Sequence, residues 1–241
     1  MIEDLVVENR HDHDFTTIVC LHCGKEIVVP VYCGNRFCPI CSKPRLARVR
    51  RRIEFLIKNT EKENGRSFKH LTLTLRSQPD LPGMLKYLTR SFRKMRNTKL
   101  WKRFVSGGAF VIEVTHSDAG YHAHIHSIIY ADYIEFNELL RMWVKCSGSR
   151  GVYIKRIPEH QIVRYLTKYI SKPTDDQAIE DAVHRSLQGF RLFQPFGTWY
   201  NLSKKFIDVR PGCPDCGGSS FLPTDILYRE IHQKYGWSGG P

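Results

Sequence analysis

The segment YLTKYISK, residues 165–172, repeats a tyrosine and a lysine at a spacing that suits phosphoryl transfer. At about 100° per residue, four of its side chains share one side of a helix. These side chains are Tyr165, Lys168, Tyr169 and Lys172. A phenol can attack a phosphate and keep the bond energy in a covalent link, and a nearby ammonium group favours the ionised phenol. Amphipathic surface helices with this composition are common, so the segment needs support from other motifs.

A second segment, HAHIH at residues 122–126, has the spacing of a metal-binding strand. In a strand, His122, His124 and His126 project from the same face. If the preceding loop is the four residues 118–121, Glu113 lies opposite His126 on that face. Two imidazoles and one carboxylate leave open positions on a divalent ion, as a catalytic site requires. A shift of one residue would remove Glu113 from the face, and a strand with solvent-facing histidines is the alternative.

The eight cysteines are better explained by metal than by disulfides if the protein is cytoplasmic. Two Cys-x-x-Cys pairs, separated by fourteen residues, predict one structural zinc site of four thiolates. Its expected ligands are Cys20, Cys23, Cys38 and Cys41. Cys33 is an alternative ligand for one of the four positions, whereas His22 is expected to be a bystander.

A third pair, Cys213 and Cys216, is half of a second possible zinc site. Cys146, Cys33 or a distant histidine would have to complete it. The alternative for all of these residues is a set of reduced, buried thiols.

The net charge of +13, with a pI near 9.5, indicates a polyanionic partner, and nucleic acid is the leading candidate. Basic residues cluster at 45–58 and 89–103, between apolar residues at helical spacing. The expected DNA contacts are Arg48, Arg51, Arg52, Arg93 and Lys94; solvated helix faces are the alternative. No run of 18 apolar residues and no signal pattern occurs, so we expect a cytoplasmic protein with no membrane partner.

These motifs require a sheet to position them. Strands are predicted at 69–76, 109–116, 122–130 and 152–157, and helices at 44–59, over some twenty residues after Pro82, at 135–145 and from 159 to Pro173. Because 109–116 and 122–130 form a hairpin, we expect an α+β fold with an antiparallel central sheet and flanking helices. The expected domains are a zinc segment with its basic helix (1–60), a nuclease domain (61–205) and a C-terminal tail with Cys213 and Cys216 (206–241).

KHLTLTL, HAHIH and YLTKYISK, in this order, resemble the three motifs of HUH endonucleases, specifically rolling-circle replication initiators with two tyrosines. The resemblance covers residues 68–172 and implies a ferredoxin-like or RRM-like nuclease fold. It implies that His124 and His126 bind Mg²⁺ or Mn²⁺, with Glu113 as the acidic ligand and His122 outside the pair. CGNRFCPIC and the Arg-rich helix after it, residues 33–52, are similar to the zinc segment that precedes such nuclease domains.

This resemblance implies that Tyr165 nicks single-stranded or hairpin origin DNA. The products are a 5′-phosphotyrosine link and a free 3′-OH for a polymerase, and Tyr169 allows a second transfer that rejoins strands. The sequence has no G-x-x-x-x-G-K-[ST] motif, so we expect a separate helicase.

Three alternatives remain at this stage. A transposase would use the same chemistry on different DNA ends. A non-catalytic zinc-dependent DNA-binding module would need the charge and the cysteines but neither HAHIH nor YLTKYISK. A metalloenzyme acting on small molecules would leave the basic surface unexplained.

Overall fold

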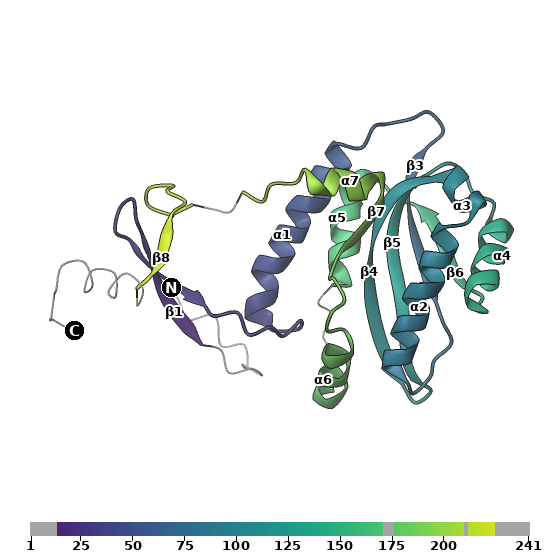
Figure 1. The fold of residues 1–241 in the computed structure, drawn as a ribbon, viewed down its shortest axis with the longest axis horizontal. Coiled ribbons are helices and arrows are strands. Elements are labelled where there is room, and N and C mark those ends of the chain that lie inside the picture. The colour runs from purple at the N-terminus through teal and green to yellow at the C-terminus, as the bar shows by residue number, and fades with distance from the viewer. Residues whose placement is uncertain (1–13, 171–175, 210–211, 225–241) are drawn as a thin grey trace. The chain divides into compact units, whose positions relative to one another are not determined.

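The computed structural model describes residues 14–170, 176–209 and 212–224. The chain divides into two units (Figure 1): residues 1–41 with 208–241, and residues 42–207. This division differs from the three expected segments. The basic helix belongs to the second unit because Ile53 and Leu56 are buried in its core. The C-terminal segment belongs to the first unit because its strand pairs with one from the N-terminal part.

The second unit is built on a five-stranded antiparallel sheet of order β6-β3-β5-β4-β7. Its strands are β3 (Ser67–Thr74), β4 (Val105–Ser117), β5 (Gly120–Ala131), β6 (Gly151–Arg156) and β7 (Gln194–Gly197). The predicted α+β class with an antiparallel sheet is therefore confirmed. The edge strand β7 was not predicted, because four residues containing a proline give little strand signal.

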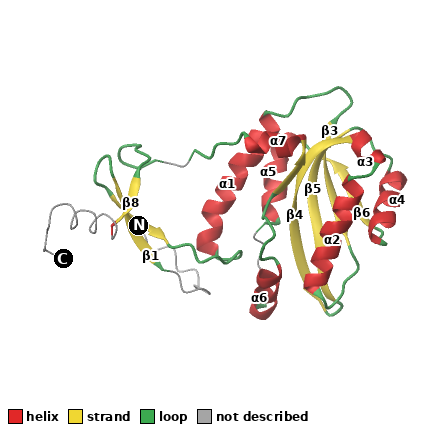
Figure 2. Ribbon diagram, viewed as in Figure 1, coloured by secondary structure: helices red, strands yellow, loops and turns green. Residues whose placement is uncertain are grey.

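Helices cover both faces of this sheet (Figure 2). On one face, α2 (Leu81–Arg96) packs Phe92 against Phe110 of β4, with ring centroids 5.2 Å apart, and α4 (Phe136–Ser147) packs beside α2. The other face is covered by α1 (Pro39–Lys58), α5 (Glu159–Lys168) and α7 (Thr198–Lys204). The remaining helices are α3 (Lys99–Phe104) and α6 (Gln177–Ser186).

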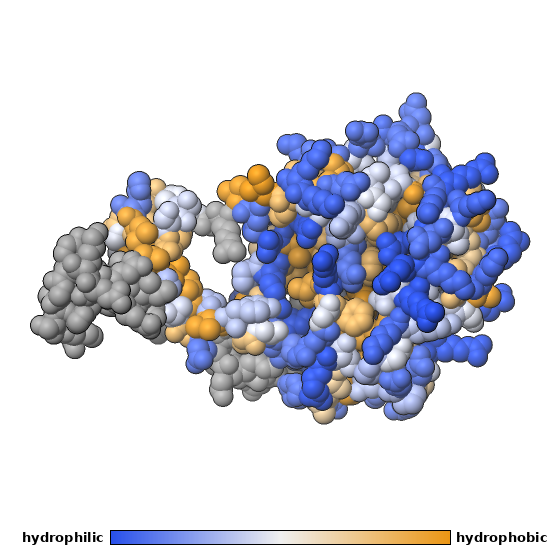
Figure 3. Space-filling model, viewed as in Figure 1, coloured by the Kyte–Doolittle hydropathy of each residue, from blue (hydrophilic) through white to orange (hydrophobic). Residues whose placement is uncertain are grey.

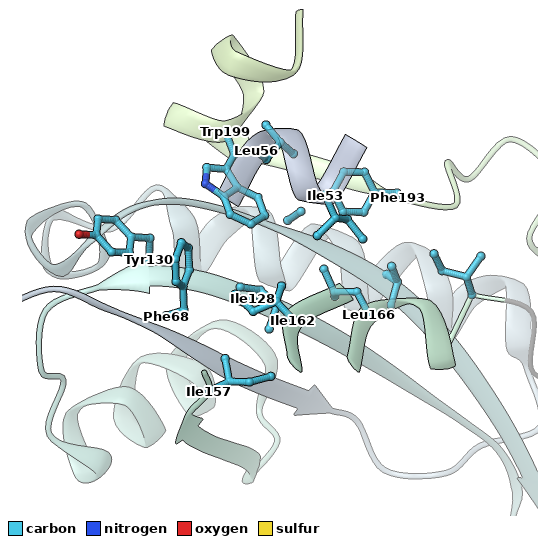
Figure 4. Close-up of a cluster of buried hydrophobic side chains, with 13 residues drawn as sticks. Ile53, Leu56, Phe68, Ile128, Tyr130, Ile157, Ile162, Leu166, Phe193 and Trp199 are labelled. Atoms are coloured by element: carbon cyan, nitrogen blue, oxygen red, sulfur yellow. The ribbon is translucent and has the colours of Figure 1, made fainter. Parts of the chain in front are cut away.

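The face beneath α1 and α5 holds a continuous apolar core (Figure 4). Alternate residues of β3, β4 and β5 point into it, as the two-residue period of a strand requires. Its buried members include Ile53, Leu56, Phe68, Ala109, Val111, Ile128, Tyr130, Ile162, Leu166, Ile170, Phe193 and Trp199. The Trp199 indole donates a hydrogen bond to Thr60 Oγ1 at 2.8 Å, so its polar atom is satisfied inside the core.

The β4–β5 hairpin has a tighter turn than expected. Ser117 pairs with Gly120, which leaves a two-residue loop, and Glu113 therefore lies opposite His124 and not His126. The expected four-residue loop was wrong, and the true pairing of β4 with β5 is shifted by two residues from the expected one. A shift of two keeps the face of every side chain, because side chains alternate with a period of two. Glu113 thus stays on the histidine face.

Two helix boundaries also differ from the prediction. The single basic helix expected after Pro82 is broken at Asn97, the C-cap of α2, before α3 begins. The helix expected to run to Pro173 ends at Lys168, with Tyr169 as its C-cap. Lys172 lies outside the described residues.

The first unit contains a small sheet of order β2-β1-β8. Its strands are β1 (Phe15–Cys20), β2 (Glu26–Pro30) and β8 (Phe221–Pro223), and all pairs are antiparallel. Within the described part of the chain, no helix is both long and apolar enough to cross a membrane.

Candidate active site on the histidine face

The face of β5 beneath α5 changes from apolar to polar along the strand. Tyr130 and Ile128 belong to the buried core, and His126, His124 and His122 follow at every second residue on the same face. Helix α5 is fixed over this transition because Leu166 is fully buried in the core. Its tyrosines therefore meet the histidines where the apolar core ends.

His126 is the centre of the arrangement. Its Nε2 lies 2.8 Å from Glu113 Oε2, and both side chains are buried, with 6% and 8% of their surface exposed. Its Nδ1 lies 3.4 Å from the Tyr165 hydroxyl and 3.3 Å from Thr72 Oγ1. When Nε2–H donates to Glu113, Nδ1 becomes the acceptor for the phenol. Carboxylate, imidazole and phenol are thereby connected in series.

Both tyrosines of YLTKYISK contact His126. The Tyr169 ring stacks on the imidazole with centroids 3.5 Å apart and planes 2° from parallel. The Tyr165 ring lies edge-on, with its centroid 6.1 Å from that of His126 and 5.3 Å from that of Tyr169. The structure therefore brings together Tyr165, Tyr169, His126 and Glu113, which lie on three separate elements.

The environment of Tyr165 keeps its phenol protonated. Burial raises the pKa of Tyr165 to about 12, and the hydrogen bond with Thr72 Oγ1, 3.3 Å away, opposes that rise only in part. Ionisation at neutral pH therefore requires a proton acceptor or an added positive charge beside the hydroxyl.

Strand β3 contributes two residues that the sequence analysis did not assign to the site. Thr72 bonds the Tyr165 hydroxyl, and the His70 ring meets the Tyr165 ring edge-on with centroids 4.7 Å apart. Burial lowers the pKa of His70. The signal was present in the alternation of KHLTLTL, which puts His70 and Thr72 on one strand face.

The expected metal ligands are only partly assembled. The 2.8 Å between His126 Nε2 and Glu113 Oε2 suits neighbouring ligands of one divalent ion, since bonds of about 2.1 Å at right angles place such atoms about 3 Å apart. His124 Nε2 instead lies 3.4 Å from Thr115 Oγ1, and the His122 ring packs beside that of His124. Among the described residues, only cysteine groups bring three or more metal-ligating atoms within 4.8 Å of one another. The assignment of Glu113, His124 and His126 to a metal stays a prediction.

The expected lysine and arginine contacts fall into different environments. Lys168 is exposed, with its Nζ 5.4 Å from the centre of the Tyr169 ring. On α1, Arg48 is exposed and Arg51 is half-buried. Arg52 instead donates to Ser203 Oγ of α7 and lies over the Phe193 ring, and burial lowers its pKa. Arg52 therefore links α1 to α7, and its expected role as a DNA contact stays a prediction.

Arg93 and Lys94 are exposed on α2, on the sheet face opposite the tyrosines. The basic residues of the second unit are thus distributed over both sides of the sheet. Figure 3 shows a largely hydrophilic surface over the visible face of this unit.

The cysteines gather in groups that differ from the predicted zinc site. Cys20 and Cys23 lie with Cys213 and Cys216, whereas Cys38 and Cys41 lie with Cys33. The reason is the pairing of β1 with β8, in which Cys20 lies opposite Phe221 and so brings the two distant segments together. Cys146 is buried in α4 and joins neither group.

Comparison with known proteins identifies the family. Residues 25–199 match the family model described as "Replication protein". The chain is 30% identical over 128 residues to "Protein rep" of Streptococcus pneumoniae, covering 46% of this chain and 40% of that protein. It is 26% identical over 140 residues to "Protein rep" of Bacillus amyloliquefaciens, covering 52% of this chain and 41% of that protein.

The matched part thus spans about two-fifths of the length of these curated relatives. No solved structure matches the chain. The family match covers well over half of the sequence and includes the strands and the helix that carry Glu113, His126 and both tyrosines. The chain therefore belongs to the Rep family of replication proteins.

Proposed function

We propose that this Rep protein starts rolling-circle replication by nicking single-stranded or hairpin origin DNA with a tyrosine of α5, as an HUH-type endonuclease and strand transferase. The observation that carries the proposal is the contact of both Tyr165 and Tyr169 with His126, itself bonded to the buried Glu113. A structural role would require neither two phenols nor a buried carboxylate at this place.

In the proposed reaction, the Tyr165 oxygen attacks the scissile phosphorus and the bond to the 3′-oxygen breaks. The 5′-phosphate stays on the tyrosine, and the departing 3′-oxygen takes up a proton to become the 3′-OH that a polymerase extends. With Nε2–H donated to Glu113, His126 Nδ1 accepts the phenol proton across 3.4 Å. Attack of a 3′-OH on the phosphotyrosine reverses the step and rejoins strands.

Tyr169 would serve as the second nucleophile. Its ring stacks on the same imidazole, so both phenols belong to one site, and Tyr169 would attack a second phosphate while the first link is still present. Lys168, beside the Tyr169 ring, would bind phosphate oxygens, and we propose the same role for Lys172.

Glu113, His126 and His124 would hold Mg²⁺ or Mn²⁺ with open positions. Such an ion would supply positive charge at the scissile phosphate. If His126 Nε2 is instead a ligand, its Nδ1 already carries a hydrogen that would donate to the Tyr165 oxygen, and the phenol proton would pass to solvent and not to His126. In either tautomer, His126 Nδ1 thus lies next to the Tyr165 oxygen.

The charge of +13 and the exposed Arg48 support binding to the DNA backbone. We propose a separate helicase and polymerase as partners in the cytoplasm, and a structural zinc ion as a second metal. The match to replication proteins favours an initiator over a transposase, and strand transfer between transposon ends would indicate the transposase.

The test is a covalent adduct on a denaturing gel, using labelled single strands from the replicon's own origin and Mn²⁺. The wild type should form the adduct, and the double variant Tyr165→Phe, Tyr169→Phe should form none. Each substitution removes only a hydroxyl, so packing is retained. Tyr133→Phe, at an exposed tyrosine 76% accessible, is the matched control and should match the wild type. An adduct in the double variant would overturn the proposal.

A further inference from the structure

The described residues of the first unit bury few apolar side chains. In its described part, the buried apolar side chains are those of Cys20, Cys38, Cys41 and Cys213. Large apolar residues such as Phe15, Val28 and Tyr32 are exposed. Within the described residues, the C-terminal segment pairs with β1 only through β8, a strand of three residues. Apolar burial on this scale contributes little stability, so a metal crosslink between the described segments would add what this burial does not supply.

Two turns from opposite ends of the chain have the same backbone geometry. Each has the sequence Cys-x-x-Cys-Gly, at 20–24 and at 213–217. In each, the glycine N–H donates to the carbonyl of the first cysteine at 2.8 Å, and the glycine has a positive φ, 76° for Gly24 and 72° for Gly217. The N–H of each first cysteine donates to the residue after the glycine, at 2.9 Å for Cys20 and 2.7 Å for Cys213.

This matched geometry turns both cysteines of each pair toward one point. Cys20 Sγ lies 3.6 Å from Cys216 Sγ, and Cys23 Sγ lies 3.6 Å from Cys213 Sγ. All four sulfur atoms lie within 4.8 Å of one another. Four sulfurs bound to zinc at about 2.3 Å in a tetrahedron are about 3.8 Å apart, which is close to these separations.

Backbone and charged groups of the two turns lie close to the sulfur atoms. The Gly218 N–H donates to Cys216 Sγ at 3.4 Å, and such backbone donors stabilise negative sulfur. Lys25 of one turn forms an ion pair with Asp215 of the other, with Nζ and Oδ2 3.3 Å apart. The two turns therefore face each other as halves of one site.

We infer that Cys20, Cys23, Cys213 and Cys216 bind a single zinc ion that fastens the N-terminal segment 14–30 to the C-terminal segment 212–224. The zinc ion would thus link two segments of the chain that flank the second unit, residues 42–207, in sequence. The inference deepens the proposed structural zinc and uses no residue of the nuclease site, so its failure would leave the proposed nicking reaction untouched. The other group, Cys33 with Cys38 and Cys41, is separate and has three thiols within the described residues.

The first test is the zinc content of the purified full chain, measured by elemental mass spectrometry. Cys20→Ser and Cys216→Ser should each lose one zinc ion per chain, and the double variant should lose the same single ion, because both residues serve one site. Cys146→Ser, at a buried cysteine in the second unit, is the control and should keep the wild-type content. Unchanged zinc in both single variants, or loss of two ions in the double variant, would overturn the inference.

The second test needs no variant and so does not depend on how the variants fold. Cys23 and Cys216 are exposed, so without a metal their thiols are accessible to iodoacetamide, and a denatured sample gives, for reference, their alkylation without native structure. If zinc holds them, peptide mass spectrometry should find all four cysteines protected in the native chain and alkylated together after a chelator is added. Rapid alkylation of Cys23 and Cys216 without the chelator would contradict the inference.

Discussion

The two units of this chain hold chemically reactive side chains in place by different means. In the second unit, His126 and the tyrosines are positioned by an apolar core that continues directly beneath them. In the described part of the first unit, the buried apolar side chains are cysteines. In the second unit, we therefore expect that substitution of a site residue can remove activity and leave the fold intact. In the first unit, we expect substitution of a proposed zinc ligand to remove the metal and the fold together.

The largest expected difference between the two units is their response to removal of metal. A structural zinc site contributes about 10 kcal/mol to folding, so we expect chelation to unfold the first unit. The second unit, with its own core, should keep its cooperative unfolding transition. Limited proteolysis with and without chelator measures the first effect, and circular dichroism melting measures the second.

Zinc added back should restore protease resistance in the first unit. If the chelated chain stays resistant, or if both units melt together at a lower temperature, the contrast between the two units is incorrect.

A smaller effect is expected from Leu166→Ala in α5. Leu166 is fully buried, so its truncation should cost about 2–5 kcal/mol of unfolding free energy in urea. Adduct formation should also fall, because the helix that carries both tyrosines loses its anchor, while zinc content should not change. Val163→Ala, at a half-buried neighbour on the same helix, should cost about 1 kcal/mol.

Equal costs for the two variants would mean that burial of Leu166 does not fix α5. Loss of zinc in either variant would show that the units are coupled.

The smallest effect concerns the pH dependence of stability. Burial raises the pKa of Tyr165 from 10.0 to about 12, so folding favours the neutral phenol. Its contribution, about 2 kcal/mol, is complete below pH 10 and is lost as the pH rises from about 10 through 12. Urea unfolding at several alkaline pH values should show a shallower loss of stability for Tyr165→Phe than for the wild type.

Tyr133→Phe, at an exposed tyrosine, should follow the wild-type curve and so serves as the reference. Identical slopes for Tyr165→Phe and the wild type would show that burial of this phenol is not linked to stability.

The histidine face was predictable because it depends on local alternation. The spacing of HAHIH assigns His122, His124 and His126 to one face whatever the turn. The turn itself was not predictable, since the segment 117–121 permits either a two-residue or a four-residue loop. The structure selects the shorter loop, with Tyr121 bridged to Gln78, a residue some forty positions earlier in the chain.

The cysteine groups and the contact of Arg52 with Ser203 could not be predicted because the partners are distant in sequence. Spacing favoured joining Cys23 to Cys38, but pairing of β1 with the short β8 decides otherwise, and local pattern gives little signal for a three-residue strand. Arg52 and Arg48 look alike in the sequence and lie on the same helix. The partner of Arg52, Ser203, lies about 150 residues later in the chain, where no local pattern indicates it.

The most direct test of the account is to identify the residue that carries the DNA. The wild-type adduct, formed with an origin single strand and Mn²⁺, should be digested with nuclease and protease and its peptides sequenced by mass spectrometry. We predict a nucleotide 5′-phosphate on the peptide containing Tyr165 after the first nick, and on Tyr169 when Tyr165→Phe is used. A nucleotide attached to any residue outside α5 and its C-cap Tyr169 would contradict the account.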